Sequence, residues 1–193
     1  VIDMDLEKFF DTVSQSKLIE VLSRTIKDGR VISLIHKYLN AGVIADGIFE
    51  RTEVGMPQGG PLSPLLSNVM LNELDKELER RRHRFVRYAD DFRIFCRTKT
   101  DALKTKIAIT QWLKERLKLD VSEEKTRIVN VKRRYSEFLG FKIKVVPKSG
   151  KLVVGSHISD KAWKRQRENL IEQAKHIAKA TPHHTELDEI KRY

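Results

Sequence analysis

The spacing of apolar and polar residues changes from strand-like to helical within the first forty positions. Residues 1–6 alternate apolar and acidic side chains, which predicts a strand with Asp3 and Asp5 on one face. Residues 14–40 then show apolar residues at helical spacing, interrupted near Asp28 and Gly29. We therefore expect a strand followed by two short helices.

A hairpin, a loop and a longer helix are predicted next. Residues 42–54 combine glycines with β-branched residues, which is typical of a β-hairpin. Residues 55–61 are rich in glycine and proline and predict a loop. Ser63 is the predicted N-cap of a helix with Pro64 in its first turn, running to about residue 81. Its apolar stripe consists of Leu66, Met70, Leu74 and Leu78.

Two apolar strands with adjacent acidic residues between them follow. Residues 83–97 are strand-like on both sides of Asp90 and Asp91, which places these aspartates at a hairpin turn. Thr100 with Asp101 predicts the start of another helix, and a strand is expected near residues 126–131. The predicted apolar stripe of that helix consists of Leu103, Ile107, Leu113 and Leu117.

The predicted elements specify a fold class. Up to residue 131 they run strand, helices, strand, strand, helix, strand, which is the βαββαβ ferredoxin-like order. This α+β fold has an antiparallel sheet with helices packed on one face. A further hairpin is expected between residues 138 and 154, turning at Lys148–Gly150. A basic helix is expected over residues 159–179, with a stop signal at Thr181. We place a domain boundary near residue 155, between residues 1–154 and residues 155–193.

Composition and charge narrow the classes of function. The chain has 193 residues, with 38 Lys and Arg against 27 Asp and Glu, a net charge of +11. Its hydrophobic residues (40%) and charged residues (34%) exclude a disordered chain, and no apolar run is long enough to span a membrane. The single cysteine, Cys96, rules out an intramolecular disulfide and favours a reducing, cytoplasmic location. The positive charge favours a polyanionic partner, nucleic acid first.

The adjacent carboxylates of Asp90 and Asp91 are the strongest chemical signal. Two carboxylates in a tight, buried hairpin repel each other unless a cation neutralises them, although an exposed turn would tolerate them. Oxygen ligands without His or Cys favour Mg²⁺ or Mn²⁺ over zinc. Asp3 and Asp5 end another strand of the same predicted sheet, and the residues alone leave them as equal candidates for a third ligand. Three carboxylates are suited to two metal ions of the kind used in phosphoryl transfer.

Five segments resemble motifs A to E of reverse transcriptases in order and spacing. They are Asp5–Asp11, Gly55–Pro64, Tyr88–Asp91, Ser122–Thr126 and Phe138–Phe141. The continuation Leu65–Asn68, with Leu74 and Asp75, is typical of bacterial group II intron proteins. The resemblance covers about residues 1–150 and implies the palm of an RNA-directed DNA polymerase.

The resemblance also implies a role for individual residues. Two Mg²⁺ ions, or Mn²⁺ as a substitute, would be held by Asp5, Asp90, Asp91 and the backbone carbonyl of Leu6. Asp5 is favoured over Asp3 because the family has an aromatic residue five positions later, here Phe10.

Other positions would contact the substrates. The resemblance implies that Phe10 stacks under the sugar, that Gln58 and Gly59 lie against the nucleotide or template, and that Lys125 neutralises or protonates the leaving pyrophosphate. Core packing is the alternative for Phe10, as we expect for Phe9, and a solvated surface position is the alternative for Lys125. Primer and template contacts are implied for Tyr88, Phe138, Leu139, Gly140, Lys161, Lys164 and Arg165.

The implied partners are an RNA template with a DNA primer, dNTPs and the group II intron RNA. The chain starts at Val1 inside a strand-like segment, so we expect a piece of a longer protein: a palm and the start of a thumb (the maturase or X region), without fingers. Such a piece would be weak or inactive alone and could self-associate, for example as a homodimer.

An RNA-binding maturase role without polymerisation is the main alternative. Retron and diversity-generating reverse transcriptases stay open, whereas nucleotide cyclisation on the same fold is disfavoured by the motifs at Tyr88 and Phe138.

Overall fold

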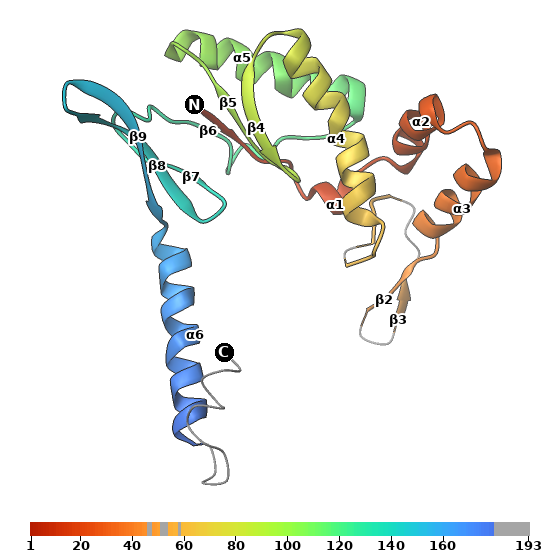
Figure 1. Ribbon diagram of the computed structural model, residues 1–193. Helices are drawn as coiled ribbons and strands as arrows, with labels where there is room; N and C mark the ends of the chain where they lie inside the picture. Colours follow the sequence, from red (N-terminus) through yellow and green to blue (C-terminus); the bar gives the residue numbers. More distant parts are fainter. Residues whose placement is uncertain (46–47, 51–53, 58, 180–193) are drawn as a thin grey trace. The chain divides into compact units, whose positions relative to one another are not determined.

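A computed structural model describes residues 1–45, 48–50, 54–57 and 59–179 (Figure 1). The chain divides into two compact units, Val1–Asn130 and Val131–Tyr193. Among the described residues, no helix is both long and apolar enough to cross a membrane.

The first unit is built on a four-stranded antiparallel sheet. Its strands are β1 (Ile2–Met4), β4 (Arg84–Tyr88), β5 (Asp91–Phe95) and β6 (Arg127–Ile128). They lie in the order β4-β5-β1-β6, and every neighbouring pair is antiparallel. With the helices that connect them, this is the strand order of the βαββαβ ferredoxin-like fold. The predicted fold class is confirmed.

Helices fill both connections of this unit. The first connection holds α1 (Phe9–Thr12), α2 (Gln15–Thr25), α3 (Gly29–Leu39), the antiparallel pair β2 (Val43–Ala45) and β3 (Ile48–Glu50), and α4 (Ser63–Arg80). The second holds α5 (Lys99–Trp112) and the π-helical turn η1 (Leu113–Leu117). The predicted break between the two short helices is confirmed, because the Asp28 carboxylate accepts the N–H of Arg30 at 2.8 Å and caps α3.

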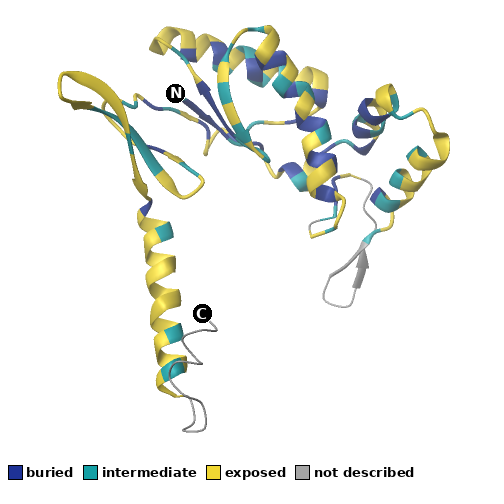
Figure 2. Ribbon diagram, viewed as in Figure 1, coloured by how far each residue is buried: buried dark blue, intermediate teal, exposed yellow. Residues whose placement is uncertain are grey.

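The core lies between one face of this sheet and the helices (Figure 2). Ile2 and Met4 of β1 and Phe92 and Ile94 of β5 are fully buried on that face. The predicted stripe of α4 is confirmed, since its four members are also buried: Leu66, Met70, Leu74 and Leu78. Burying these side chains supplies most of the driving force for packing α4 on the sheet.

Two predicted helix starts are wrong. Leu62, not Ser63, is the N-cap of α4, because the Ser63 hydroxyl donates instead to the carbonyl of Pro57 at 2.6 Å. Thr98, not Thr100, caps α5, and its hydroxyl accepts the N–H of Asp101 at 3.1 Å. Hydroxyl residues stand at or near each start, and contacts with the adjacent backbone decide which role each one takes.

The predicted stripe of α5 is only half right. Leu113 and Leu117 are buried, whereas Leu103 and Ile107 are exposed. Leu113 lies six positions after Ile107, short of the roughly seven that return to the same face after two turns. The buried face instead continues from Leu113 back through the residues Ile109, Thr105 and Ala102.

The second unit contains a three-stranded antiparallel sheet and one long helix. The strands are β7 (Ser136–Phe138), β8 (Phe141–Lys148) and β9 (Lys151–Ile158), and the helix is α6 (Asp160–Ala178). Each hairpin turn has two residues with positive φ, Leu139 and Gly140 in one and Ser149 and Gly150 in the other. This is the type I′ geometry that matches the twist of paired strands.

The boundary between the two compact units lies after Asn130. The N–H of Ser159 donates to the carbonyl of Gly140 at 2.7 Å, and Lys142 of β8 forms an ion pair with Asp160 of α6. These contacts join the hairpins to the helix that follows them. The functional division into residues 1–154 and 155–193 stays a prediction. The predicted basic helix over residues 159–179 is confirmed as α6, and the predicted stop signal at Thr181 lies outside the described residues.

Candidate active site

The sheet face opposite the core carries a charged row centred on Asp3. The register pairs Asp3 with Arg93 of β5 and Arg127 of β6. The Asp3 carboxylate is buried, with Nε of Arg93 at 3.0 Å and Nε of Arg127 at 3.4 Å. Two arginines therefore balance the charge of Asp3. This pairing distinguishes Asp3 from Asp5, a distinction that the sequence did not provide.

Asp5 lies one residue beyond β1 and is held by the segment that resembles motif D. Its carbonyl accepts the N–H of Ser122 at 2.9 Å, and its own N–H donates to the hydroxyl of Thr126 at 3.3 Å. The carboxylate is one third exposed, and Nζ of Lys125 lies 3.4 Å from its Oδ1. Lys125 is thus adjacent to the predicted metal ligand, while its role toward the pyrophosphate stays a prediction.

Asp90 and Asp91 lie at the turn between β4 and β5, as predicted. The register pairs Tyr88 with Asp91, so the loop consists of Ala89 and Asp90 alone. Ala89 has φ +52°, a conformation that costs a residue with a side chain about 1–2 kcal/mol. Continuing the β1–β5 register by one residue places Asp5 opposite Asp91. The turn and the end of β1 thereby bring the three predicted carboxylates to one edge of the sheet.

Electrostatic coupling among these carboxylates appears at Asp91. Burial raises the pKa of the Asp91 carboxyl above its ordinary value; the guanidinium of Arg93 lowers it, and the negative charges of Asp5 and Asp90 raise it further. Nη1 of Arg93 lies 2.5 Å from Oδ1 of Asp91. Arg93 thus bridges Asp3 and Asp91. The sequence analysis missed this residue, whose only signal was an arginine inside an otherwise apolar strand.

Arg87 is a second residue that the sequence analysis missed. Its guanidinium donates to both carboxylate oxygens of Asp75 at 2.8 and 2.5 Å, to Oδ1 of Asn68 at 3.0 Å and to the carbonyl of Ala89 at 2.9 Å. It therefore ties the strained turn to α4. Asn68 and Asp75 are seven residues apart, two helical turns, so the sequence did place them on one face.

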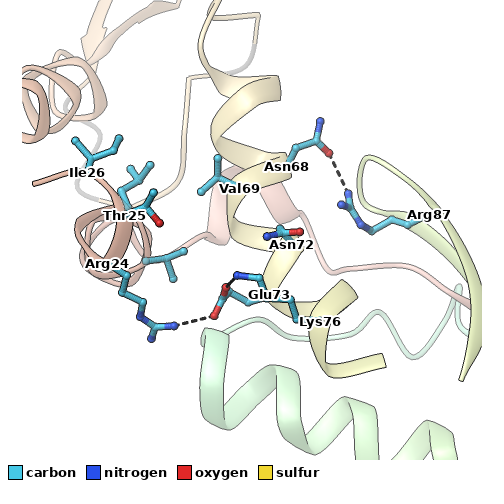
Figure 3. A pocket seen from close by; sticks show the side chains of 11 residues that line it. Arg24, Thr25, Ile26, Asn68, Val69, Asn72, Glu73, Lys76 and Arg87 are labelled. Atoms are coloured by element: carbon cyan, nitrogen blue, oxygen red, sulfur yellow. Dashed lines mark hydrogen bonds and ion pairs between the residues drawn. The ribbon is translucent and has the colours of Figure 1, made fainter. Parts of the chain in front are cut away.

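A pocket of about 510 Å³ lies between α2 and α4 on the side of Arg87 and Asn68 (Figure 3). Val69 and Ile26 form part of its apolar lining. Arg24 and Glu73, which also line the pocket, form an ion pair at 2.7 Å that is drawn as a dashed line in Figure 3. None of the predicted site residues lines this pocket.

The donor set has the chemistry of a hard-cation site. Asp5, Asp90 and Asp91 offer only carboxylate oxygens, and their mutual repulsion would be relieved by a divalent cation. The Asp5 carbonyl and the Glu7 N–H are bonded on either side of the Leu6–Val121 bridge, which directs the Leu6 carbonyl away from Val121. The described residues nevertheless contain no preassembled group of three His, Cys, Asp or Glu ligands. The oxygen donors of these residues suit Mg²⁺. In this structure Arg93 pairs with Asp91 and Lys125 pairs with Asp5.

The segments that resemble motifs A and B are joined through their backbones. The N–H of Met56 donates to the carbonyl of Phe10 at 2.7 Å, and the N–H of Gly55 donates to that of Val13 at 2.8 Å. Gly55 has φ +83°, and a Cβ there would lie 2.6 Å from the Phe10 carbonyl oxygen, so only glycine fits. Phe9 is buried in the core, whereas Phe10 is only partly buried against it.

The residues predicted to contact nucleotide, primer and template lie in both units. Gly59 has φ +80° and open space around it, while Gln58 lies outside the described residues. Tyr88 is 65% exposed and is therefore not a packed core aromatic. In the second unit, Phe138 ends β7, Leu139 and Gly140 form the β7–β8 turn, and the basic residues on the first turns of α6 are exposed: Lys161, Lys164 and Arg165.

Most of the chain matches a known protein family. Residues 1–143 match the family described as reverse transcriptase (RNA-dependent DNA polymerase). The chain belongs to the reverse transcriptase family. Family members in general use divalent metal ions, which agrees with the carboxylate edge described above.

Individual relatives of this reverse transcriptase chain refine the comparison. Protein YkfC of Escherichia coli (strain K12) is 47% identical over 81 residues, which are 42% of this chain and 21% of YkfC. Group II intron-encoded protein LtrA of Lactococcus lactis subsp. cremoris is 28% identical over 220 residues, 78% of this chain and 37% of LtrA. The resemblance to group II intron-encoded reverse transcriptases is thereby confirmed.

A solved structure supports the fold. Apo telomerase from Candida tropicalis, truncated from its C-terminal domain, superposes with a TM-score of 0.59 at 20% identity, covering 81% of this chain and 35% of that chain. The chain thus spans less than two fifths of the length of each of these relatives.

Proposed function

We propose that this chain is the palm, with the start of a thumb, of a group II intron-type reverse transcriptase that acts in RNA-directed DNA synthesis. The observation that carries the proposal is the position of Asp5, one residue beyond β1, where its charge acts on Asp91 next to Asp90 at the β4–β5 turn. The proposed site would catalyse nucleotidyl transfer from a dNTP to the 3′-hydroxyl of a primer on an RNA template, in the cytoplasm of a bacterium.

The residues that would hold two Mg²⁺ or Mn²⁺ ions are Asp5, Asp90, Asp91 and the Leu6 carbonyl. When bound, such ions act as Lewis acids toward the attacking hydroxyl and the leaving pyrophosphate. The protein's own part is positioning. Arg93 orients Asp91 through one oxygen and leaves the other available, and Lys125 beside Asp5 would neutralise or protonate the pyrophosphate.

Further groups of the chain would hold the substrates. Phe10, partly buried in α1, would stack under the sugar of the dNTP, with Gln58 and Gly59 against the base pair. Tyr88 would lie near the primer terminus. Residues 138–140 would hold the primer strand, and the basic start of α6 would follow the phosphates of the duplex without reading sequence.

Primer extension on an RNA template with Mg²⁺ tests the proposal. We expect slow extension by the full 193-residue chain, reduced at least about 100-fold in Asp90→Asn, because that variant removes a charge where metal must bind. Asp101→Asn, an exposed aspartate on α5, is the matched control. Mn²⁺ binding followed by electron paramagnetic resonance gives a second readout that does not require turnover.

Equal Mn²⁺ binding by the wild-type chain and by Asp90→Asn would refute the metal assignment. Fast, processive synthesis by the chain would refute only the expectation that it is weak by itself. Size-exclusion chromatography measures the proposed self-association separately.

An RNA-binding maturase role is the second candidate, favoured by the likeness to the group II intron-encoded protein LtrA. In that case the chain would bind group II intron RNA whether or not the carboxylates hold metal. Binding that survives both Asp90→Asn and chelation of metal supports this role, whereas binding that is lost with metal argues against it.

A further inference from the structure

One face of the second unit's sheet carries an aromatic and basic cluster that no motif explains. The rings of Tyr135 and His157 meet edge to face, with centroids 4.9 Å apart and planes at 74°. The ammonium of Lys144 lies 5.1 Å from the centroid of the Tyr135 ring. Such a cation–π contact fixes the ring orientation.

The strand register explains why these side chains gather. Lys142 pairs with His157 and Lys144 pairs with Gly155, so all four lie on one face of β8 and β9. Gly155 adds no side chain to this face. A Cβ at Gly155 would make only ordinary contacts, the nearest at 3.4 Å to Val146, so the glycine is not required by crowding.

The cluster is accessible and lies in positive surroundings. Tyr135 is 41% exposed, and His157 is exposed as well. Residues 132–134 are three consecutive exposed basic residues immediately before the tyrosine. The one acid on this row is Glu137, which lies opposite Lys142, and Lys142 is also paired with Asp160.

An exposed ring with cations around it has the composition of a stacking platform for unpaired bases. Every base offers a π-face, so stacking on an aromatic side chain needs no particular sequence, and nearby cations contact the phosphates. A paired duplex hides its base faces, so a platform of this kind selects single strands. Lys144 lies over the Tyr135 ring, and a base would stack on the part of the ring that stays exposed.

We propose that Tyr135, with His157 and Lys144, binds an unpaired nucleotide of a nucleic-acid strand. The inference deepens the proposed function by naming how its nucleic-acid partner is held in the second unit. Lys144 keeps the ring in place, and residues 132–134 supply charge for the adjoining phosphates. The site does not depend on metal or on the carboxylates of the first unit.

Equilibrium binding of the full chain to an unstructured RNA of about 12 nucleotides tests this, with one base replaced by 2-aminopurine and with metal chelated. We expect Tyr135→Leu to weaken binding about tenfold, within the range that stacking contributes per base. The quenching of 2-aminopurine, a direct signature of stacking, is expected in the wild-type chain and in Tyr135→Phe and absent in Tyr135→Leu. Thermal unfolding verifies that each variant is folded.

Phe95→Leu is the matched control, because Phe95 is an exposed aromatic on β5 of the first unit, outside the cluster. We expect it to bind as the wild type does. Equal affinity and equal quenching in Tyr135→Leu would overturn the proposal, as would duplex RNA whose binding depends on Tyr135 to the same degree. The binding assay contains neither metal nor dNTP, so a failed primer-extension test does not affect its outcome.

Discussion

Two arginines fix the β4–β5 turn from opposite faces of the sheet. Arg87 faces α4 and bonds Asp75 and the Ala89 carbonyl, whereas Arg93 faces the charged row and pairs with Asp91. A turn with a positive φ at Ala89 persists only when its surroundings hold it. We infer that these arginines position the carboxylates without contacting substrate.

Removing the Arg87 brace should cost stability. We expect Arg87→Gln to lower the free energy of unfolding by about 2 kcal/mol, since several hydrogen bonds to a half-buried carboxylate are lost. Urea denaturation measures the change. Arg84→Gln, an exposed arginine on the same strand, is expected to be neutral, and equal stability of the two variants would contradict the role of Arg87.

Glu77 gives a prediction for pH. Hydrogen bonds from Arg80 and then from Arg81 lower the pKa of the buried Glu77 carboxyl to about 2, below the ordinary 4.5, although burial opposes them. Because the folded pKa is depressed, the ionised carboxylate stabilises the fold above about pH 4.5, and this contribution disappears as pH falls toward 2. Glu77→Gln should therefore lose about 1–2 kcal/mol at pH 7 and progressively less in acid.

Urea denaturation between pH 7 and about pH 3 measures this difference, with the exposed Glu79→Gln as control. A difference between Glu77→Gln and wild type that stays constant over this range would show that ionisation of Glu77 is not its cause.

Substitutions at Gly55 and Gly59 can distinguish the cost of backbone conformation from the cost of steric crowding. Both have positive φ, but only Gly55 has the Phe10 carbonyl within 2.6 Å of an added Cβ. Gly59→Ala should cost about 1 kcal/mol from conformation alone. Gly55→Ala should cost clearly more, because α1 and the loop must move apart. Chemical denaturation compares them, and equal losses would mean that the close approach is unimportant.

At the scale of elements, the two hairpins of the second unit share one turn type with different residues. The β8–β9 turn has Ser149 and Gly150, whereas the β7–β8 turn has Leu139 and Gly140. Type I′ turns favour Asn-Gly, so leucine is strained at its position. Leu139 is also half exposed, which agrees with its proposed contact with the primer.

Leu139→Asn should relieve this strain and stabilise the second unit by roughly 0.5–1 kcal/mol. Thermal unfolding followed by circular dichroism measures the gain. Leu152→Asn, which replaces an exposed leucine on β9, is the control and should bring none. Destabilisation by Leu139→Asn would indicate that the leucine makes packing contacts that outweigh the strain.

At the scale of the whole molecule, charge is divided unevenly between the two units. Residues 131–193 hold 15 Lys and Arg against 7 Asp and Glu, which is +8 of the total +11. The first unit carries the carboxylate edge with only +3. The second unit therefore has the stronger attraction for phosphates.

This division predicts how salt affects nucleic-acid binding. Replacing Lys161, Lys164 and Arg165 with Gln should reduce the slope of log affinity against log salt by about 2 for a single strand, since three cations no longer release counterions. Fluorescence anisotropy across a salt series measures the slope. An equal charge removal on α5, at Lys99, Lys104 and Lys106, is the control, and the same reduction there would mean that binding is not localised.

The sequence by itself determined the fold class and the placement of Asp90 and Asp91 at a turn. Alternation over residues 1–6, the stripe of α4 and the Asp90–Asp91 turn depend on local periodicity, which strands and helices obey wherever they pack. The order and spacing of the motifs then identified the family, which the comparisons confirmed.

The tertiary structure alone decided which residues surround those carboxylates. Asp3 and Asp5 share a strand face, and only pairing across strands gave Asp3 two arginines and Asp5 a lysine. Arg87 meets Asp75 twelve positions away, and Tyr135 meets His157 across a sheet. Such contacts join residues distant in sequence, and local periodicity carries no information about the partner across the sheet.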